Sequence, residues 1–215
     1  MLRYHIMPVT AFAQNCTLLW CDQSQAAVLV DAGGEPQRLR TEVAKRQLHL
    51  QALWVTHGHV DHVGAVGQLA EELNLPVLGP GVEDDYWLQA LPSIARQYGF
   101  APAAVLKPDR WLQDGDRLSV GEESLRVIHC PGHTPGHMVF YHEPSQLALV
   151  GDVLFAGSIG RSDFPGGDGP TLIRSIRERL FSLGDEVAFI PGHGPMSTMG
   201  EERQHNPFVA DSQWG

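Results

Sequence analysis

Thr56-His57-Gly58-His59-Val60-Asp61-His62 is the stretch from which the fold and the chemistry of this chain can be read. Apolar residues precede it from Ala52 to Val55 and a helical pattern follows it, so it reads as a loop leaving the end of a strand. Imidazole and carboxylate side chains are preferred ligands of zinc, iron and manganese. We therefore expect a metal site here, rather than a polar loop that happens to contain several histidines.

The hydrophobic pattern around this stretch predicts strands before and after it, with helices between them. Pro36 opens the first predicted helix, and a second one follows His62. A third helix is predicted over 171–183, with Gly184 at its end. The predicted strands cover 2–9, 15–21, 26–30, 52–56, 76–79, 117–120, 125–128, 138–141, 147–150 and 187–190.

Three further candidate ligands follow later strands: His133, Asp152 and His193. Each lies next to a glycine, which allows the backbone to turn sharply and to come close to an ion. Taken singly, each of these loops is a weak signal. Ligands placed at the ends of strands in a layered sheet can, however, converge in one crevice.

The composition is that of an ordinary globular protein and excludes several classes of function. The chain has 215 residues, 43% of them hydrophobic, and a formal net charge of −10, with no basic stripe that would suit nucleic acid. No signal peptide is visible and no apolar run approaches the ~20 residues that span a bilayer. We expect one domain over 1–215, in the cytoplasm, with neither a nucleic-acid nor a membrane partner; the oligomeric state stays open.

The chain has three cysteines, Cys16, Cys21 and Cys130. A small, odd number of cysteines does not build a disulfide framework, so the chain suits a reducing compartment. Cys16 and Cys21 are expected to be buried thiols, and Cys130 a partly buried and inert one.

The ordered set of motifs resembles the metallo-β-lactamase superfamily, whose pattern is T-H-x-H-x-D-H, then a distant His, an Asp and a final His. Within it, the segments 131–137 (PGHTPGH) and 192–194 (GHG) look like glyoxalase II, hydroxyacylglutathione hydrolase. Only about twenty residues follow the last His, so the chain is most similar to short bacterial forms that lack the C-terminal helical domain. The resemblance implies an α+β fold, a four-layer αββα sandwich of two packed sheets with helices outside.

The resemblance also implies a ligand set for two divalent metal ions, zinc in the first place, with iron or manganese as alternatives. The first ion takes His57, His59 and His133. The second takes Asp61, His62 and His193, while Asp152 and a water or hydroxide bridge the two ions. Asp61 would also act in catalysis by orienting that hydroxide. Asp31, at the end of a strand, looks like the carboxylate that supports a ligand, the alternatives being a turn residue or direct catalysis.

The activity implied is hydrolysis of a small acyl thioester of the S-lactoylglutathione type. A thiolate leaves without a strong general acid, whereas an amide nitrogen needs a proton donor, and none is obvious in the sequence. By resemblance, Arg161 would bind the glutathione part of the substrate. The alternative is that Arg161 forms a salt bridge with Asp163 or Asp168 and only supports its loop.

Residues 80–110 interrupt the rhythm of strands and helices. They are aromatic, punctuated by proline and glycine, and expected to contain short helical stretches. Such a segment is either a lid over a site or a packed surface excursion anchored by Tyr86 and Trp87. The polar residues 196–215 are expected to form a C-terminal tail, with a short helix and an extended end.

A second reaction class stays open. Residues 160–164 (GRSDF) are also similar to a loop of the persulfide dioxygenases, which share the fold, hold one iron through the positions of His57, His133 and Asp152, and consume oxygen with glutathione persulfide. A non-enzymatic metal-binding or redox-sensing domain is a third interpretation. A nucleic-acid-processing enzyme would need a large inserted domain, and a lactamase would need an export signal.

Overall fold

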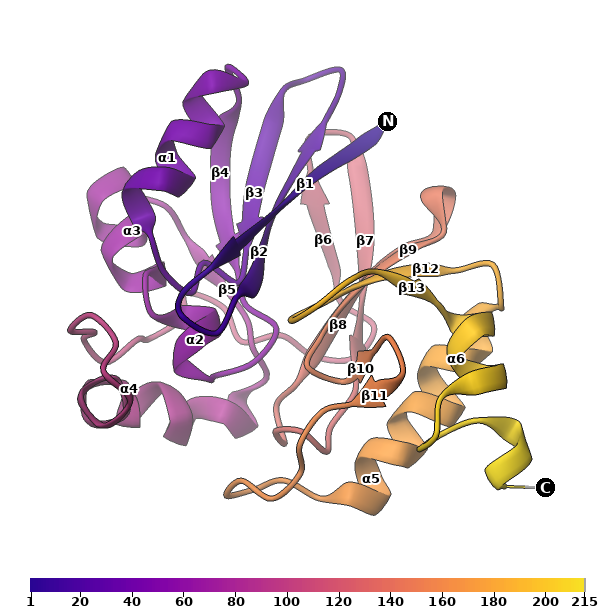
Figure 1. Cartoon of the computed structure of the whole chain (residues 1–215). Coiled ribbons are helices and arrows are strands. Elements are labelled where there is room, and N and C mark those ends of the chain that lie inside the picture. The colour runs from indigo at the N-terminus through magenta and orange to yellow at the C-terminus, as the bar shows by residue number, and fades with distance from the viewer. Residues whose placement is uncertain (215) are drawn as a thin grey trace.

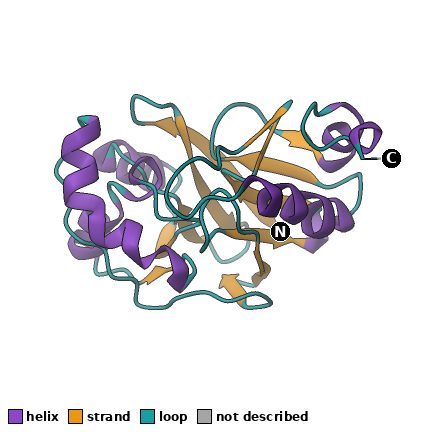
Figure 2. Cartoon of the chain, turned by 90° about the horizontal axis from the view of Figure 1, so that it is seen from below, coloured by secondary structure: helices purple, strands orange, loops and turns teal. Residues whose placement is uncertain are grey.

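The computed structural model describes residues 1–214, so residue 215 of the expected tail lies outside the described part. Two β-sheets lie face to face, and helices cover their two outer sides (Figures 1 and 2). This arrangement confirms the expected αββα sandwich.

The first sheet has the strand order β1-β2-β3-β4-β5. The first three strands form an antiparallel meander, and β4 and β5 join it in parallel through helical crossovers. The elements of this half are β1 (Leu2–Val9), β2 (Gln14–Cys21), β3 (Ala26–Val30), α1 (Pro36–Lys45), β4 (His49–Trp54), α2 (Val60–Val63), α3 (Val66–Leu73) and β5 (Val77–Leu78).

The second sheet has the order β13-β12-β9-β8-β7-β6, in which only β9 and β12 pair in parallel. Its strands are β6 (Arg117–Val120), β7 (Glu123–His129), β8 (Met138–His142), β9 (Leu147–Gly151), β12 (Ala188–Pro191) and β13 (Ser197–Thr198). A small hairpin, β10 (Leu154–Phe155) and β11 (Ser158–Ile159), follows β9. The sequence did not predict this hairpin or β13, whose strands are only two residues long.

Helical elements cover the outer face of the second sheet. The predicted helix over 171–183 begins two residues earlier than expected, at Gly169, where Asp168 accepts a hydrogen bond from the backbone N–H of Thr171. The helical elements of this half are η2 (Glu143–Ser145), α5 (Gly169–Arg174), the π-helical η3 (Ser175–Leu180), η4 (Phe181–Leu183), α6 (Met199–His205) and η5 (Asp211–Gln213).

The alternation of side chains along the strands explains the layers. In β3, Leu29 packs towards the outer helices, whereas Val28 points between the two sheets. In β8, Phe140 points between the sheets and Val139 towards α5. Buried apolar residues thus form three cores, one between the sheets and one under each helical layer.

The segment expected to contain short helical stretches instead forms η1 (Val82–Asp84) and one 14-residue helix, α4 (Asp85–Tyr98). The helix buries Leu88, Leu91 and Ala95 against the first sheet's outer core. The expectation of short helical stretches in a segment punctuated by proline and glycine was therefore wrong, and Pro92 lies inside the helix. Whether this segment moves as a lid stays a prediction.

The carboxyl ends of β3, β4, β7, β9 and β12 lie at one edge of the sandwich, because β3 and β4 run in parallel, as do β9 and β12. Backbone hydrogen bonds join the two sheets at this edge. The N–H of Met138 donates to the carbonyl of Thr56 (2.8 Å), and the N–H of Asn15 to that of Gly192 (2.7 Å). The loops that follow these strands are therefore brought together.

All three cysteines are unpaired and buried. Cys130 has no exposed surface, so the expectation of a partly buried thiol was wrong in degree. Burial raises the pKa of Cys130 to about 12, in keeping with an inert thiol. Among residues 1–214, none of the helices has the length and apolar character needed to cross a bilayer.

The core between the sheets supports one prediction. Phe140 of β8 is fully buried and meets Trp54 of β4 edge to face, with ring centroids 5.5 Å apart. Phe140→Ala should lower the free energy of unfolding by about 3–5 kcal/mol through lost burial and a cavity. Phe208→Ala removes a side chain that is 48% exposed, so its free energy of unfolding should stay within about 0.5 kcal/mol of that of the wild type. Denaturant unfolding measures both, and equal stabilities would contradict the assignment of this core.

Candidate metal centre

The structure brings together all seven residues that the sequence suggested as metal ligands. Four come from the loop after β4, and one each from the loops after β7, β9 and β12. They are His57, His59, Asp61, His62, His133, Asp152 and His193. Their role as ligands remains a prediction, and their positions decide how well they suit it.

The first group consists of three imidazoles. The Nδ1 atom of His59 lies 3.2 Å from Nε2 of His57 and 2.9 Å from Nε2 of His133. His57 is fully buried and His133 almost so. Three ring nitrogens therefore face one point, as the ligands of a single ion do.

The second group consists of Asp61, His62 and His193. The Oδ2 atom of Asp61 lies 3.1 Å from Nε2 of His193 and 3.8 Å from Nε2 of His62. Asp61 and His62 are adjacent in sequence and share the first turn of α2, which directs both side chains to this side of the first group.

Asp152 lies between the two groups. Its Oδ1 is 3.3 Å from Nε2 of His62, and its Oδ2 is 3.6 Å from Nε2 of both His133 and His193. A Cβ atom on Gly192 would lie 2.0 Å from Oδ1 of Asp152, so this position requires glycine for the carboxylate to reach the cluster. Asp152 is thus placed to be shared by two ions.

Four of the five histidines have their other ring nitrogen held by an oxygen atom. Nδ1 of His57 lies 3.0 Å from Oγ1 of Thr56, and Nδ1 of His62 lies 2.9 Å from Oδ2 of Asp31. The other two contacts join Nδ1 of His133 to the Arg161 carbonyl (2.7 Å) and Nδ1 of His193 to the Phe12 carbonyl (3.1 Å). When Nδ1 donates in these contacts, Nε2 is left unprotonated and faces the cluster, as metal ligation requires.

Asp31 supports this arrangement, as the sequence suggested. Its carboxylate accepts hydrogen bonds from the N–H of Thr56 (2.8 Å) and the hydroxyl of Thr56 (2.6 Å), in addition to its contact with His62. A single buried carboxylate therefore orients the ring of His62 and, through Thr56, the ring of His57. These contacts of the carboxylate distinguish Asp31 from a residue that only forms a turn.

The protonation behaviour of the cluster suits divalent cations. Burial lowers the pKa of His57 and of His133, and lowers that of His59 to about 3, so these rings are neutral ligands. Burial also opposes the charged form of His62, but Asp152 and Asp61 overcome it and raise its pKa. Nε2 of His62 and Oδ1 of Asp152 are buried without a hydrogen-bond partner. Facing donor atoms without partners, in a mixed imidazole and carboxylate set, fit a pair of divalent ions.

Asp84 is a residue that sequence reasoning missed. It has no exposed surface and accepts hydrogen bonds from the N–H of Gly58 (2.9 Å), the hydroxyl of Thr134 (2.8 Å) and the N–H of Gly136 (2.6 Å). One carboxylate thus joins the loop of His57 and His59 to the loop of His133. Burial raises the pKa of Asp84 to about 6, although these hydrogen bonds favour the ionised form. Nothing in its sequence neighbourhood distinguishes it from a helix-start aspartate.

His137 is the other buried supporting group. Its Nε2 accepts a hydrogen bond from the N–H of Asp152 (3.1 Å), and its ring stacks on His57 with an interplanar angle of 18°. His129 and His137 each lie four residues from His133 in the sequence. The structure places His137 against two of them, whereas the ring of His129 contacts the carbonyl of Pro135.

Arg161 pairs with Asp163 through two hydrogen bonds of 2.9 and 2.8 Å, and its guanidinium lies 4.4 Å above the ring of Phe164. Asp168, the other partner considered, caps α5 instead. Arg161 is exposed and lines the cavity described next, so its guanidinium remains accessible to a ligand as well as to Asp163.

A cavity of about 610 Å³ opens above the cluster, and we call it the reaction cavity. Five of the candidate ligands, His59, Asp61, His133, Asp152 and His193, form its polar floor, and aromatic and aliphatic side chains form most of its walls. Trp87 and Phe164 contact His59 at ring distances of 4.5 and 5.1 Å, and Phe155 lies 6.2 Å from His193. The wall residues are Phe12, Val60, Trp87, Ile94, Tyr98, Phe155, Ser158, Ile159, Arg161 and Phe164.

Comparison with known proteins agrees with this geometry. The model of a family described as the metallo-beta-lactamase superfamily matches residues 9–193. Hydroxyacylglutathione hydrolase GloC of Haemophilus influenzae is 43% identical over 209 residues, which cover 97% of this chain and 98% of that protein.

Two solved structures are similar over almost their whole length. BLEG-1 B3 metallo-beta-lactamase has a TM-score of 0.88 and 35% identity, covering 96% of this chain and 99% of its own. TTHA1623, solved in a di-iron-bound form, has a TM-score of 0.87 and 38% identity, covering 95% and 100%.

The position of Asp84 yields a prediction about metal affinity. Asp84→Asn keeps the shape of the side chain but replaces one carboxylate oxygen with an NH₂ group. This new donor then faces another donor, either a backbone N–H or the hydroxyl of Thr134. The two loops should separate slightly, and metal affinity should fall by about 10-fold or more. Competition with a chromophoric chelator measures this affinity without any turnover.

The matched control is Asp85→Asn. Asp85 is adjacent in sequence, but the only side chain that hydrogen-bonds to it in the described structure is Gln89. This variant should bind metal like the wild type. Equal affinities in all three proteins would show that Asp84 does not set the spacing of the two loops.

Proposed function

Since the chain belongs to the metallo-β-lactamase superfamily, we propose that it is a metal-dependent hydrolase of small acyl thioesters, of which S-lactoylglutathione is the first candidate. The observation that carries this proposal is the set of seven converging donors, shared between two groups by Asp152, beneath a cavity of about 610 Å³. The similarity to a hydroxyacylglutathione hydrolase supports the thioester class.

In the proposed site His57, His59 and His133 hold one divalent ion, and Asp61, His62 and His193 hold the other. Asp152 is shared between them. Zinc suits this set, and the di-iron form of TTHA1623 supports iron as an alternative. Such a pair of ions, when bound, lowers the pKa of water towards 7 and polarises a carbonyl.

The chain's own groups position the reactants. Asp61 lies at the edge of the cluster and is partly exposed to the reaction cavity, so its carboxylate can accept a hydrogen bond from the attacking water and orient it. Asp152 is buried, and its backbone N–H donates to Nε2 of His137, which holds the backbone from which the carboxylate reaches the cluster. The thioester carbonyl would reach the cluster from the reaction cavity, where His59, Asp61 and His133 line the floor.

The leaving group suits the site. A thiol has a pKa of about 8.5, so the thiolate leaves at neutral pH without a proton donor. An amide nitrogen would need one. A β-lactam therefore serves as a control substrate, which we expect to react more slowly.

Two further assignments belong to this proposal. Arg161 binds a carboxylate of the thiol carrier, which takes the place of the Asp163 carboxylate. Helix α4, which supplies Trp87, Ile94 and Tyr98 to one wall of the reaction cavity, acts as the lid. The unpaired, buried cysteines suit an enzyme of the cytoplasm.

The competing candidate is a dioxygenase with one iron held by His57, His133 and Asp152. The loop from Gly160 to Phe164 keeps it in consideration, and the separate, fully formed group of Asp61, His62 and His193 favours the hydrolase. The two differ in metal content and in their need for oxygen.

We expect purified protein to contain close to two metal equivalents and to release thiol from S-lactoylglutathione under anaerobic conditions. Removal of the metal with a chelator should abolish this activity, and zinc, iron or manganese should restore it.

Asp61→Asn should lower kcat by about 100-fold, since it removes a ligand and the group that orients water. Metal analysis and a thiol-release assay measure these outcomes. One iron per chain, with oxygen consumed on glutathione persulfide, would support the dioxygenase instead.

Arg161→Met should raise KM for a glutathione thioester by about 10-fold and leave kcat nearly unchanged, because it removes a charged hydrogen-bond donor to the substrate. Asp163→Asn is the matched control: it breaks the same ion pair but leaves the guanidinium free. If Arg161 binds substrate, Asp163→Asn keeps or lowers KM. If Arg161 only supports the loop, both variants change the kinetics alike, which steady-state measurements distinguish.

A further inference from the structure

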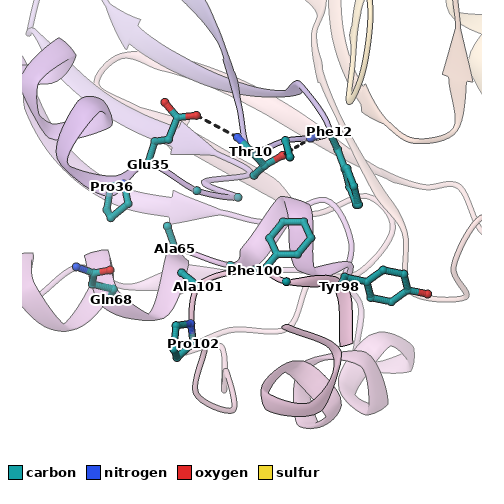
Figure 3. Close-up of a pocket in the computed structure, with 15 residues that line it drawn as sticks. Thr10, Phe12, Glu35, Pro36, Ala65, Gln68, Tyr98, Phe100, Ala101 and Pro102 are labelled. Carbon is teal, nitrogen blue, oxygen red and sulfur yellow. Dashed lines mark hydrogen bonds between the residues drawn. The ribbon is translucent and has the colours of Figure 1, made fainter. Parts of the chain in front are cut away.

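A second pocket adjoins the reaction cavity. It has a volume of about 260 Å³ and lies between the β1–β2 turn, the Gly33-Gly34 segment, α3 and the end of α4 (Figure 3). We call it the side pocket. Phe12 and Tyr98 line both spaces, so these two side chains form part of the boundary between them. Both are about half exposed, 50% and 52%, and neither is held in a core.

Aromatic and small apolar side chains supply just over half of the residues that line the side pocket, and Thr10, Glu35 and Gln68 add polar groups. Figure 3 shows Phe12, Phe100 and Tyr98 at one end of it, with Pro36 and Gln68 at the other. Phe12 meets Phe100 edge to face at 5.2 Å. Further lining residues are Ala11, Ala65, Ala101 and Pro102.

The charges of the side pocket exclude an anionic ligand. Among the described residues that line it, none is cationic. Its one carboxylate, Glu35, is already engaged by the N–H of Thr10 (3.1 Å) and by Arg38 (2.8 Å). An uncharged apolar group suits these walls better than a carboxylate or an ammonium group does.

The side pocket and Arg161 lie on opposite halves of the donor cluster. The Arg161 guanidinium stacks on Phe164, which contacts His59 and His133. Phe12 belongs to the other half, because its carbonyl holds His193. A substrate whose carrier carboxylate reaches Arg161 therefore directs its acyl group towards Phe12 and Tyr98.

We propose that the side pocket receives the acyl group of the thioester, so that the enzyme prefers apolar acyl groups longer than lactoyl. This inference rests on the proposed thioester hydrolase function. The pocket's 260 Å³ corresponds to about eight water molecules at ~30 Å³ each, which suits a chain of roughly six carbons or an aromatic ring. A lactoyl group would leave the pocket filled with water.

The first test uses thioethers, which bind but cannot be cleaved. S-hexylglutathione should bind to the metal-loaded protein at least about 10-fold more tightly than S-methylglutathione, because its hexyl chain moves from water into the side pocket. Ala101→Leu fills the pocket from an exposed loop position and should reduce that preference to about 3-fold or less. Ala104→Leu makes the same change at another exposed position of the same segment, outside the side pocket, and should keep the wild-type preference. Calorimetric titration measures all three proteins.

The second test is turnover. S-hexanoylglutathione should have a kcat/KM at least about 10-fold above that of S-lactoylglutathione, and Ala101→Leu should remove this advantage. Ala104→Leu should keep the ratio of the two kcat/KM values found for the wild type. Equal affinity of the wild type for both thioethers would overturn the acyl-pocket inference, whether or not any variant folds. So would an Ala101→Leu protein with an unchanged preference. Binding as expected, with no thioester cleaved, would refute the proposed function but leave the pocket assignment standing.

Discussion

The carboxylate of Asp152 lies buried among the rings of His62, His133 and His193, at distances of 3.3 to 3.6 Å. A buried carboxylate is costly unless charge and hydrogen bonds compensate it. Among the described residues, protein groups satisfy it only in part, since its Oδ1 has no hydrogen-bond partner there. Under the proposed metal assignment, cations between these groups would compensate the buried charge, and metal binding would be coupled to the packing of the two sheets.

Everything around the cluster holds donor atoms in fixed directions. Asp31 orients two histidines from the first sheet, and Asp84 joins the two ligand loops across the sandwich. The carbonyls of Phe12 and Arg161 do the same for His193 and His133. The backbone thus contributes as much as side chains do to the geometry, and the protein would spend little free energy on reorganising when an ion binds.

The carbonyls of Phe12 and Arg161 hold ligands in opposite halves of the cluster, while the side chains of the same residues line the reaction cavity. A substrate that contacts either side chain therefore also contacts a segment that positions a ligand.

The sequence by itself determined the strands, the helices between them and the order of the seven candidate ligands, because alternating apolar residues and metal-binding side chains are local signals. The αββα sandwich and the supporting role of Asp31 were implied only by the resemblance of the motifs to the metallo-β-lactamase superfamily. Only the tertiary structure revealed the role of Asp84 and the side pocket behind Phe12. Each of these depends on segments that are distant in the chain and meet only after the sheets pack, so no spacing or composition within one segment could indicate them.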